Sequence, residues 1–418
     1  MHLSNFQGVI GVCAIFLTIF LLSENKQKVQ WRFVIQGFLI QCIIMLLITF
    51  VPAIKSSIQS ASSFVMLLKD ATRAGTSFVF GYLGGGDAPF ILKDGAEHSL
   101  FVFAFQALPL IIVVSALSML LFHLKVIPFI VRTLSPIFQK LFHVGGAMGV
   151  VASAKLFLSQ METPLLIRPY LTNFTRTELL MVIACGMSTT SAAAVPLYAM
   201  ILGNTFDNVV PHILVASLIS IPAAITLTRI LIPEDGEKTQ GDAIAPFNFK
   251  SSMDAISKGA IDGMSIFWNI TSMLIVFAAL IFLLNALVGK ITLVTIGHAY
   301  SVQNILGYLI APFTFSMGVP WSESLEAGQL LATKTILNEV FAFAELSKST
   351  LSDHSKKIML YALCGFANFS SVGMVIGSLG TLVPERRNDI ISLAPKAVLI
   401  GTMATCLSGT LVGLLNFH

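Results

Sequence analysis

The chain has 418 residues, of which 55% are hydrophobic and 11% are charged, and its formal net charge is +4. Soluble domains carry about 25% charged residues, so a soluble fold of this length could not bury so much apolar surface in one core. The positive charge is small and dispersed, which gives no basis for a nucleic-acid partner. Composition therefore predicts an all-α membrane protein surrounded by lipid.

The reactive residue types argue against an enzyme. All five cysteines lie in apolar segments and none forms a Cys-x-x-Cys pair, so neither a disulfide framework nor a zinc site is indicated. The sequence contains no HExxH, GxSxG or paired-aspartate motif. We therefore expect no catalytic residues, no metal and no cofactor.

The first apolar segment, residues 9–22, reads as an uncleaved membrane helix. A signal peptide has its positive charge before the apolar run, whereas here Lys26, Lys28 and Arg32 follow it. Positive charge marks the inner side of a membrane, so the N-terminus is expected outside.

About 20 mostly apolar residues are needed to cross a bilayer. About eight such segments are present, and counting crossings from an outside N-terminus places both termini outside. Lysine and arginine are more frequent in the loops that this count places inside, which supports the orientation. The expected spans are 4–23, 34–54, 100–122, 177–203, 211–232, 266–288, 356–382 and 393–415.

Five segments between the spans have a different character. Residues 56–92 are mixed and glycine-rich, too polar to span, and are expected to lie along the surface. Residues 126–142 and 293–313 are predicted to form amphipathic interfacial helices. Residues 144–172 and 322–348 are semi-polar, with charge in the middle of each. Their length suits two re-entrant helical hairpins, a broken backbone that membranes tolerate only where protein or water satisfies it.

The two halves of the chain resemble each other. Residues 184–191 read Ala-Cys-Gly-Met-Ser-Thr-Thr-Ser and residues 363–370 read Leu-Cys-Gly-Phe-Ala-Asn-Phe-Ser. An acidic residue precedes each cluster, and a proline precedes each acid, at nearly equal spacing: Pro136 and Glu162 in one half, Pro312 and Glu339 in the other. Chance similarity between apolar sequences is the alternative. Such repeats are typical of transporters, and an odd number of crossings between the copies predicts that they are inverted.

This repeat and the hydrophilic linker at 234–250 suggest four parts. Residues 1–125 would form N-terminal scaffold helices and an interfacial segment. Residues 126–233 would be the first inverted repeat with hairpin 1, residues 251–292 a scaffold helix, and residues 293–418 the second inverted repeat with hairpin 2.

Glu162 and Glu339 are the strongest candidates for a binding site, because an ionisable group at membrane depth is costly and is functional by default. Carboxylates accept hydrogen bonds, and the amides of the nearby Gln160 and Asn338 both donate and accept them. We expect the two carboxylates to meet in a watery pocket midway through the bilayer and to bind a polar, hydroxyl-rich solute. The alternative is that these polar groups only hold helices together.

Four stretches resemble the concentrative nucleoside transporter family. Residues 160–171 (Gln-Met-Glu-Thr-Pro-Leu-Leu-Ile-Arg-Pro-Tyr-Leu) are similar to its first hairpin, and Asn338-Glu339-Val340 to its second. Residues 361–371 (Tyr-Ala-Leu-Cys-Gly-Phe-Ala-Asn-Phe-Ser-Ser) are similar to its most diagnostic helix, and residues 78–83 to a segment ahead of the first hairpin. The resemblance covers roughly residues 70–415.

The resemblance implies a homotrimer, with scaffold helices holding a mobile transport domain. The short eight-span form and the lack of long tails favour a bacterial inner membrane. By position, Gln160 and Glu162 would face the nucleobase, with Met161 between them. Glu339, Asn368 and Ser371 would hold the ribose hydroxyls, with Phe366 beside the ligand.

Departures from the family pattern concern the coupling ion. Met161 stands where members have a hydroxyl residue, so base preference is expected to differ. Lys155 stands where sodium-coupled members have an asparagine ligand, and Met148 where many carry an acid, although Thr189 matches the other side-chain sodium ligand. We expect a proton to drive transport, or uncoupled transport. The alternatives are a facilitator with the same site, or sodium coupling with Lys155 snorkelling to the surface.

Overall fold

A computed structural model describes residues 3–91, 101–155, 157–158, 160, 163–191, 194–203, 205–206, 208–241 and 249–415. Every regular element in these residues is a helix, as composition predicted. The helices are α1 (Leu3–Leu21), η1 (Lys26–Lys28), α2 (Trp31–Phe50), α3 (Pro52–Phe80), η2 (Gly81–Gly84), α4 (Phe103–Gln106), α5 (Leu110–His123), α6 (Val126–Phe142), α7 (Gly146–Ala154), α8 (Thr163–Leu166), η4 (Arg168–Tyr170), α9 (Arg176–Ser188), α10 (Val195–Leu202), α11 (Val209–Leu231), α12 (Ser252–Ile296), α13 (Val302–Ser316), α14 (Trp321–Ile336), α15 (Glu339–Leu346), α16 (Asp353–Leu363), α17 (Phe369–Leu382), η5 (Pro384–Arg386) and α18 (Arg387–Leu415).

Five stretches of the described chain are long and apolar enough to cross a membrane as they stand. They are Trp31–Phe50, Phe103–His123, Val209–Leu231, Ser252–Ile296 and Pro384–Leu415. Two other expected spans are each broken into a pair of helices, α9 with α10 and α16 with α17. With α1, these account for the eight spans that hydropathy predicts.

Two expectations about the helices need correction, and a third agrees with the structure. The expected surface segment at 56–92 contains most of α3, a 29-residue helix that packs against α2, α5, α10 and α11 but has mostly exposed side chains and is not among the candidate spans. The expected single span at 177–203 stops at Ser188 and resumes at Val195. The predicted start of the interfacial helix at 293–313 is wrong, because α12 continues to Ile296 and α13 begins only at Val302. Composition hides this boundary, since residues 291–296 at the end of α12 are still largely apolar.

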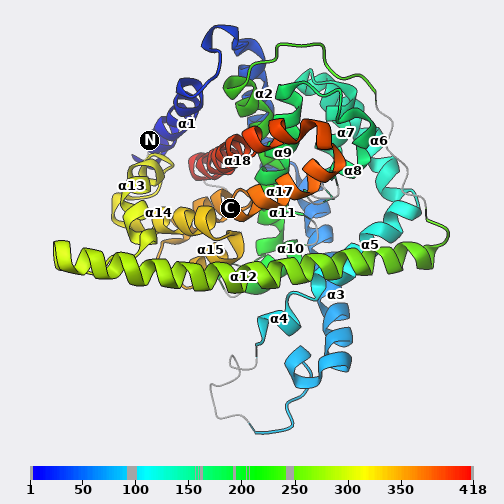
Figure 1. Ribbon diagram of the computed structural model, residues 1–418, viewed down its shortest axis with the longest axis vertical. Helices are drawn as coiled ribbons and strands as arrows, with labels where there is room; N and C mark the ends of the chain where they lie inside the picture. The colour runs from blue at the N-terminus through cyan, green and yellow to red at the C-terminus, as the bar shows by residue number, and fades with distance from the viewer. Residues whose placement is uncertain are drawn as a thin grey trace.

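Helix α12 lies along one side of the molecule and extends beyond its neighbours (Figure 1). Its 45 residues give a length of about 67 Å. It packs mainly against α5, and only 6% of its most apolar window is buried. Gly259 and Gly263 allow that packing, because a Cβ at either would lie 2.7 Å from the backbone of α5. Most other side chains of α12 are exposed.

The order of helices repeats. A proline-containing helix (α6, α13) leads to two hairpin arms (α7 and α8, α14 and α15), a broken helix (α9 with α10, α16 with α17) and a long helix (α11, α18). Counting each broken helix as one crossing, the chain crosses three times between the hairpins, so the copies are inverted. The four central helices α9, α11, α16 and α18 pack on one another and form the buried core.

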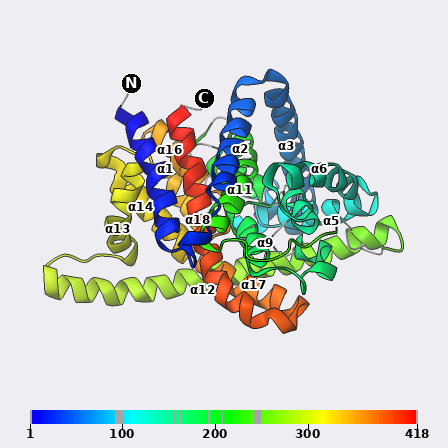
Figure 2. The same cartoon turned by 90° about the horizontal axis from the view of Figure 1, so that it is seen from above.

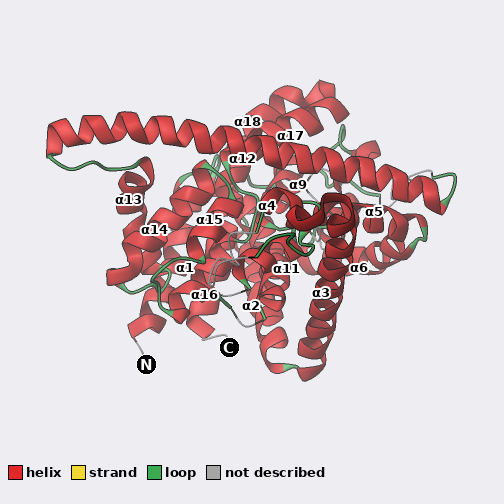
Figure 3. Ribbon diagram, turned by 90° about the horizontal axis from the view of Figure 1, so that it is seen from below, coloured by secondary structure: helices red, strands yellow, loops and turns green. Residues whose placement is uncertain are grey.

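The two ends of the chain lie together. The start of α1 and the end of α18 are found at the same edge of the molecule in both views at right angles to the first (Figure 2, Figure 3). Helices α1 and α18 also pack against each other. This arrangement agrees with an even number of crossings.

Candidate functional site

Hairpin 2 places a carboxylate at the start of a helix inside the protein. Helix α14 ends at Ile336, and Asn338 caps α15 by accepting hydrogen bonds from the backbone N–H groups of Val340 and Phe341, at 3.0 and 3.2 Å. Glu339 is the first residue of α15 and is only 5% exposed. A carboxylate is favoured there, because a helix N-terminus carries partial positive charge.

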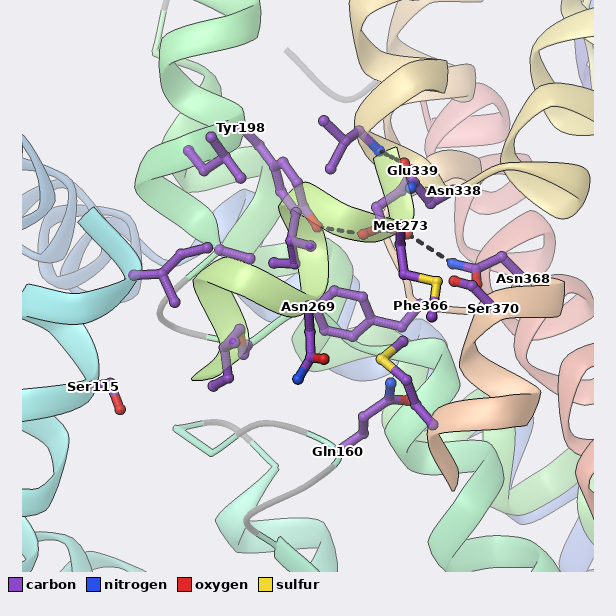
Figure 4. A pocket seen from close by; sticks show the side chains of 18 of the residues that line it. Ser115, Gln160, Tyr198, Asn269, Met273, Asn338, Glu339, Phe366, Asn368 and Ser370 are labelled. Carbon is purple, nitrogen blue, oxygen red and sulfur yellow. Dashed lines mark hydrogen bonds between the residues drawn. The ribbon is translucent and has the colours of Figure 1, made fainter. Parts of the chain in front are cut away.

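Two side chains from other helices hold Glu339 in place (Figure 4). The hydroxyl of Tyr198, on α10, donates to Oε1 at 2.9 Å. The side-chain amide of Asn368, at the start of α17, donates to Oε2 at 3.0 Å. The carboxylate thus joins hairpin 2 to both broken helices, and its oxygens keep further lone pairs for a ligand.

The break between α16 and α17 presents the other polar groups. Asn368 caps α17 by accepting from the backbone N–H of Ser371 at 2.8 Å, and it also accepts from the hydroxyl of Ser370 at 2.7 Å. Ser370 lines the cavity, whereas the Ser371 hydroxyl is buried outside the cavity lining and has no hydrogen-bond partner among the described residues. Ser371 therefore supports the cap through its backbone, and its expected contact with a ribose stays a prediction.

A cavity lies between these groups and the helices α5 and α12. Gln160 of hairpin 1 and Phe366 line it together with Glu339 and Asn368, as expected, and Figure 4 shows their side chains around one space. The side-chain oxygen of Gln160 is buried and has no hydrogen-bond partner among the described residues. A buried acceptor of this kind costs free energy unless a ligand or water satisfies it.

Sequence reasoning missed several lining residues, among them Tyr198, Ser115 and Asn269. Tyr198 lies in an apolar stretch, and its contact with Glu339 joins residues 141 positions apart. Ser115 and Asn269 line the cavity from α5 and α12. The only local signal was a polar residue within each apolar helix.

Met161 and Glu162 lie outside the described residues. The expectation that Glu162 meets Glu339 in this cavity therefore stays a prediction. Gln160, two positions before Glu162, does line the cavity.

The two residues of the expected cation site lie at the end of α9. Lys155 is 1% exposed, so it does not snorkel to the surface. Its Nζ is 3.2 Å from the position that a Cβ on Gly186 would take. The Thr189 hydroxyl donates to the backbone carbonyl of Cys185 at 2.8 Å. The position expected to supply a sodium ligand is thus occupied by a buried lysine.

Comparison with known proteins identifies the family. Residues 212–413 match the model described as "Na+ dependent nucleoside transporter C-terminus", residues 10–83 its N-terminal counterpart, and residues 104–205 the model "Nucleoside recognition". The nucleoside permease NupC of Helicobacter pylori is 31% identical over the full length of both chains. The chain belongs to the concentrative nucleoside transporter family. The uncharacterized transporter YutK of Bacillus subtilis is 36% identical over 97% of this chain and 98% of its own.

The fold of this concentrative nucleoside transporter agrees with a solved member. The structure of CNTnw in an inward-facing substrate-bound state superposes with a TM-score of 0.90 at 30% identity, covering 99% of this chain and 98% of that one. The resemblance stated from sequence is confirmed, as are the all-α fold class and the expectation that the chain is a transporter and not an enzyme.

Proposed function

We propose that this chain is a secondary active transporter that takes up nucleosides across a bacterial inner membrane, driven by protons and not by sodium. The observation that carries the substrate class is Glu339, a buried carboxylate at the wall of the cavity, fixed by Tyr198 and Asn368. A fixed carboxylate can accept two hydrogen bonds from vicinal hydroxyls, and a ribose supplies such a pair.

The rest of the cavity suits a nucleobase. The amide of Gln160, whose oxygen has no hydrogen-bond partner among the described residues, can donate and accept, which matches the edge of a base. Phe366 offers a ring face for a planar group. The mixture of an aromatic ring, an amide and a carboxylate in one cavity supports a nucleoside over a free sugar or an amino acid.

Lys155 is the reason to favour a proton as the coupling ion. In sodium-coupled relatives an asparagine is expected at its position, and here a buried ammonium lies against the end of α9. A cation in that place repels sodium and supplies equivalent charge to the helix end. Sodium coupling and uncoupled facilitation are the alternatives.

The exposed surface of α12 supports the family's homotrimer for this chain. An apolar helix that buries so little of its own surface needs either lipid or a partner. Scaffold helices would then lie at the centre of the trimer, with hairpins and broken helices moving against them.

Uptake of radiolabelled uridine and adenosine into proteoliposomes tests the proposal. Accumulation should follow an imposed inward proton gradient, collapse with a protonophore and persist when sodium is replaced by choline. Equilibration without accumulation would indicate a facilitator. Loss of uptake in choline would establish sodium coupling, and no saturable uptake of either nucleoside would contradict the substrate class.

A further inference from the structure

Two buried lysines occupy matching positions in the inverted halves. Lys155 and Lys334 each lie 31 residues before the glycine of their own Cys-Gly pair. Both are at the end of the first arm of a hairpin, where Lys155 follows α7 directly and Lys334 belongs to the last turn of α14. Their exposed fractions are 1% and 0%. A buried lysine is rare unless its charge has a partner.

The partners of the Lys334 ammonium are a helix carbonyl and a hydroxyl. Its ammonium donates to the backbone carbonyl of Ala362 at 2.8 Å and to the hydroxyl of Thr405 at 2.9 Å. Ala362 is in the last turn of α16, and the last four carbonyls of a helix have no partner within the helix. These carbonyls also carry the negative end of the helix dipole. Lys334 therefore caps the broken helix electrostatically and by a hydrogen bond.

Lys155 occupies the equivalent place in the other half. Its Nζ and Cε lie 3.2 and 3.6 Å from the position of a Cβ on Gly186, which is in the last turn of α9. The absent side chain of Gly186 is what allows the ammonium to approach this helix end. Lys155 is also close enough to act electrostatically on Cys185 in the same turn.

The carboxyl ends of α9 and α16 lie against each other, and we call this contact the joint. A Cβ on Gly365, at the break after α16, would lie 2.9 Å from the backbone carbonyl of Met187 in the last turn of α9. It would also lie 2.9 Å from the side chain of Thr405, the hydroxyl partner of Lys334. Two negative helix ends in such proximity repel each other unless cations are present.

We propose that Lys155 and Lys334 are a matched pair of positioning residues, one in each inverted half, that lock each hairpin onto the carboxyl end of its own broken helix. The pair gives the joint two built-in positive charges, so both hairpins stay docked without a bound metal ion. The inference shares Lys155 with the coupling proposal but does not depend on which solute is carried.

Native thiols allow a local test in the full-length protein. Cys185 lies beside Lys155, while Cys364 and Cys406 lie within electrostatic reach of Lys334, and all three are fully buried. Alkylation of each thiol by a small neutral maleimide, followed by mass spectrometry of membrane vesicles, reports whether the hairpin above it has opened. Cys13 is exposed and serves as the internal reference.

Lys155→Met should raise the alkylation rate of Cys185 by on the order of tenfold, and Lys334→Met should do the same for Cys364 and Cys406, each without affecting the other half. Lys290→Met, at an exposed lysine of α12, should change none of the rates. Unchanged alkylation rates in both buried-lysine variants would overturn the proposal. An equal increase in the alkylation rate of all the thiols in each variant would overturn it as well.

A second variant keeps the test informative if a methionine variant fails to fold. Gly186→Ala retains the ammonium, but the new Cβ would lie 3.0 Å from the Cβ of Gln160 and 3.2 Å from Nζ of Lys155. Both residues of hairpin 1 must then move from the end of α9, so Cys185 alone should react faster. Gly377→Ala, in α17 with no heavy atom within 4 Å of the new Cβ, is the matched control and should leave all rates unchanged. A Gly186→Ala protein with the parent Cys185 rate would contradict the role of Lys155. Because these readouts need no uptake, they remain valid if the nucleoside proposal fails.

Discussion

At the residue scale, the site depends on one carboxylate whose two oxygens are both oriented by the protein. Tyr198 and Asn368 approach Glu339 from different helices, so the carboxylate cannot rotate freely toward or away from a ligand. Holding an acceptor in its binding geometry before the ligand arrives reduces the entropy lost on binding. The precision of the site therefore comes from residues that need not touch the ligand themselves.

Tyr198→Phe should weaken nucleoside affinity roughly tenfold, because a hydrogen bond to a charged group contributes about 1.5–3 kcal/mol. The phenyl ring still packs on Phe343, whose ring centroid is 4.8 Å away, so the fold should be retained. Titration calorimetry with uridine measures the change. Tyr308→Phe, at an exposed position, is the control, and equal affinity in both variants would show that Tyr198 does not position Glu339.

At the scale of elements, the broken helices expose polar groups that continuous helices would hide. Asn368 ends one break by capping α17, and the same side chain holds Glu339. Stability and binding can be separated at this position, since serine caps a helix about as well as asparagine but lacks an amide donor.

Asn368→Ser should keep the melting temperature of the parent protein and lose most nucleoside binding. Asn368→Ala should lower the melting temperature and also lose most nucleoside binding, because the missing cap costs about 0.5–2 kcal/mol of folding stability. Thermal unfolding and uridine binding on the same purified samples make the comparison. If the serine variant binds like the parent, the contact between Asn368 and Glu339 has no part in recognition.

The sequence predicted the elements better than their interruptions. Amphipathic patterning gave the bounds of α6 correctly, and apolar length located α11 and α18. The break between α9 and α10 was missed, because its hydroxyl residues are equally compatible with a continuous membrane helix. Gln160, Glu339, Phe366 and Asn368 were found through their motifs and do line one cavity. Tyr198 was missed because only the three-dimensional fold brings it to Glu339.

At the scale of the whole molecule, two inverted halves are joined at their helix breaks and flanked by α12. The first half carries Lys155 where sodium-coupled relatives are expected to carry a ligand. The proposal of proton coupling therefore assigns the ion preference of the entire transporter to a single side chain in one half. The second half has its own lysine and no comparable departure.

Lys155→Asn should therefore make uptake depend on sodium. The amide oxygen and the hydroxyl of Thr189 would then supply the ligand types expected in sodium-coupled relatives. Uridine uptake in sodium and in choline medium measures the effect. Adding Thr189→Val should abolish the sodium response again. A folded Lys155→Asn protein that transports equally well in both media would refute this account of ion preference.

The most direct test of the central claim compares uridine and 3′-deoxyuridine binding to the parent protein and to Glu339→Gln by calorimetry. If the carboxylate of Glu339 accepts hydrogen bonds from the ribose, loss of the 3′-hydroxyl should weaken binding to the parent at least roughly tenfold, and to the variant by no more than about twofold. Glu385→Gln, at an exposed carboxylate, should behave like the parent. The same penalty for the missing hydroxyl in the parent and in Glu339→Gln would contradict the claim.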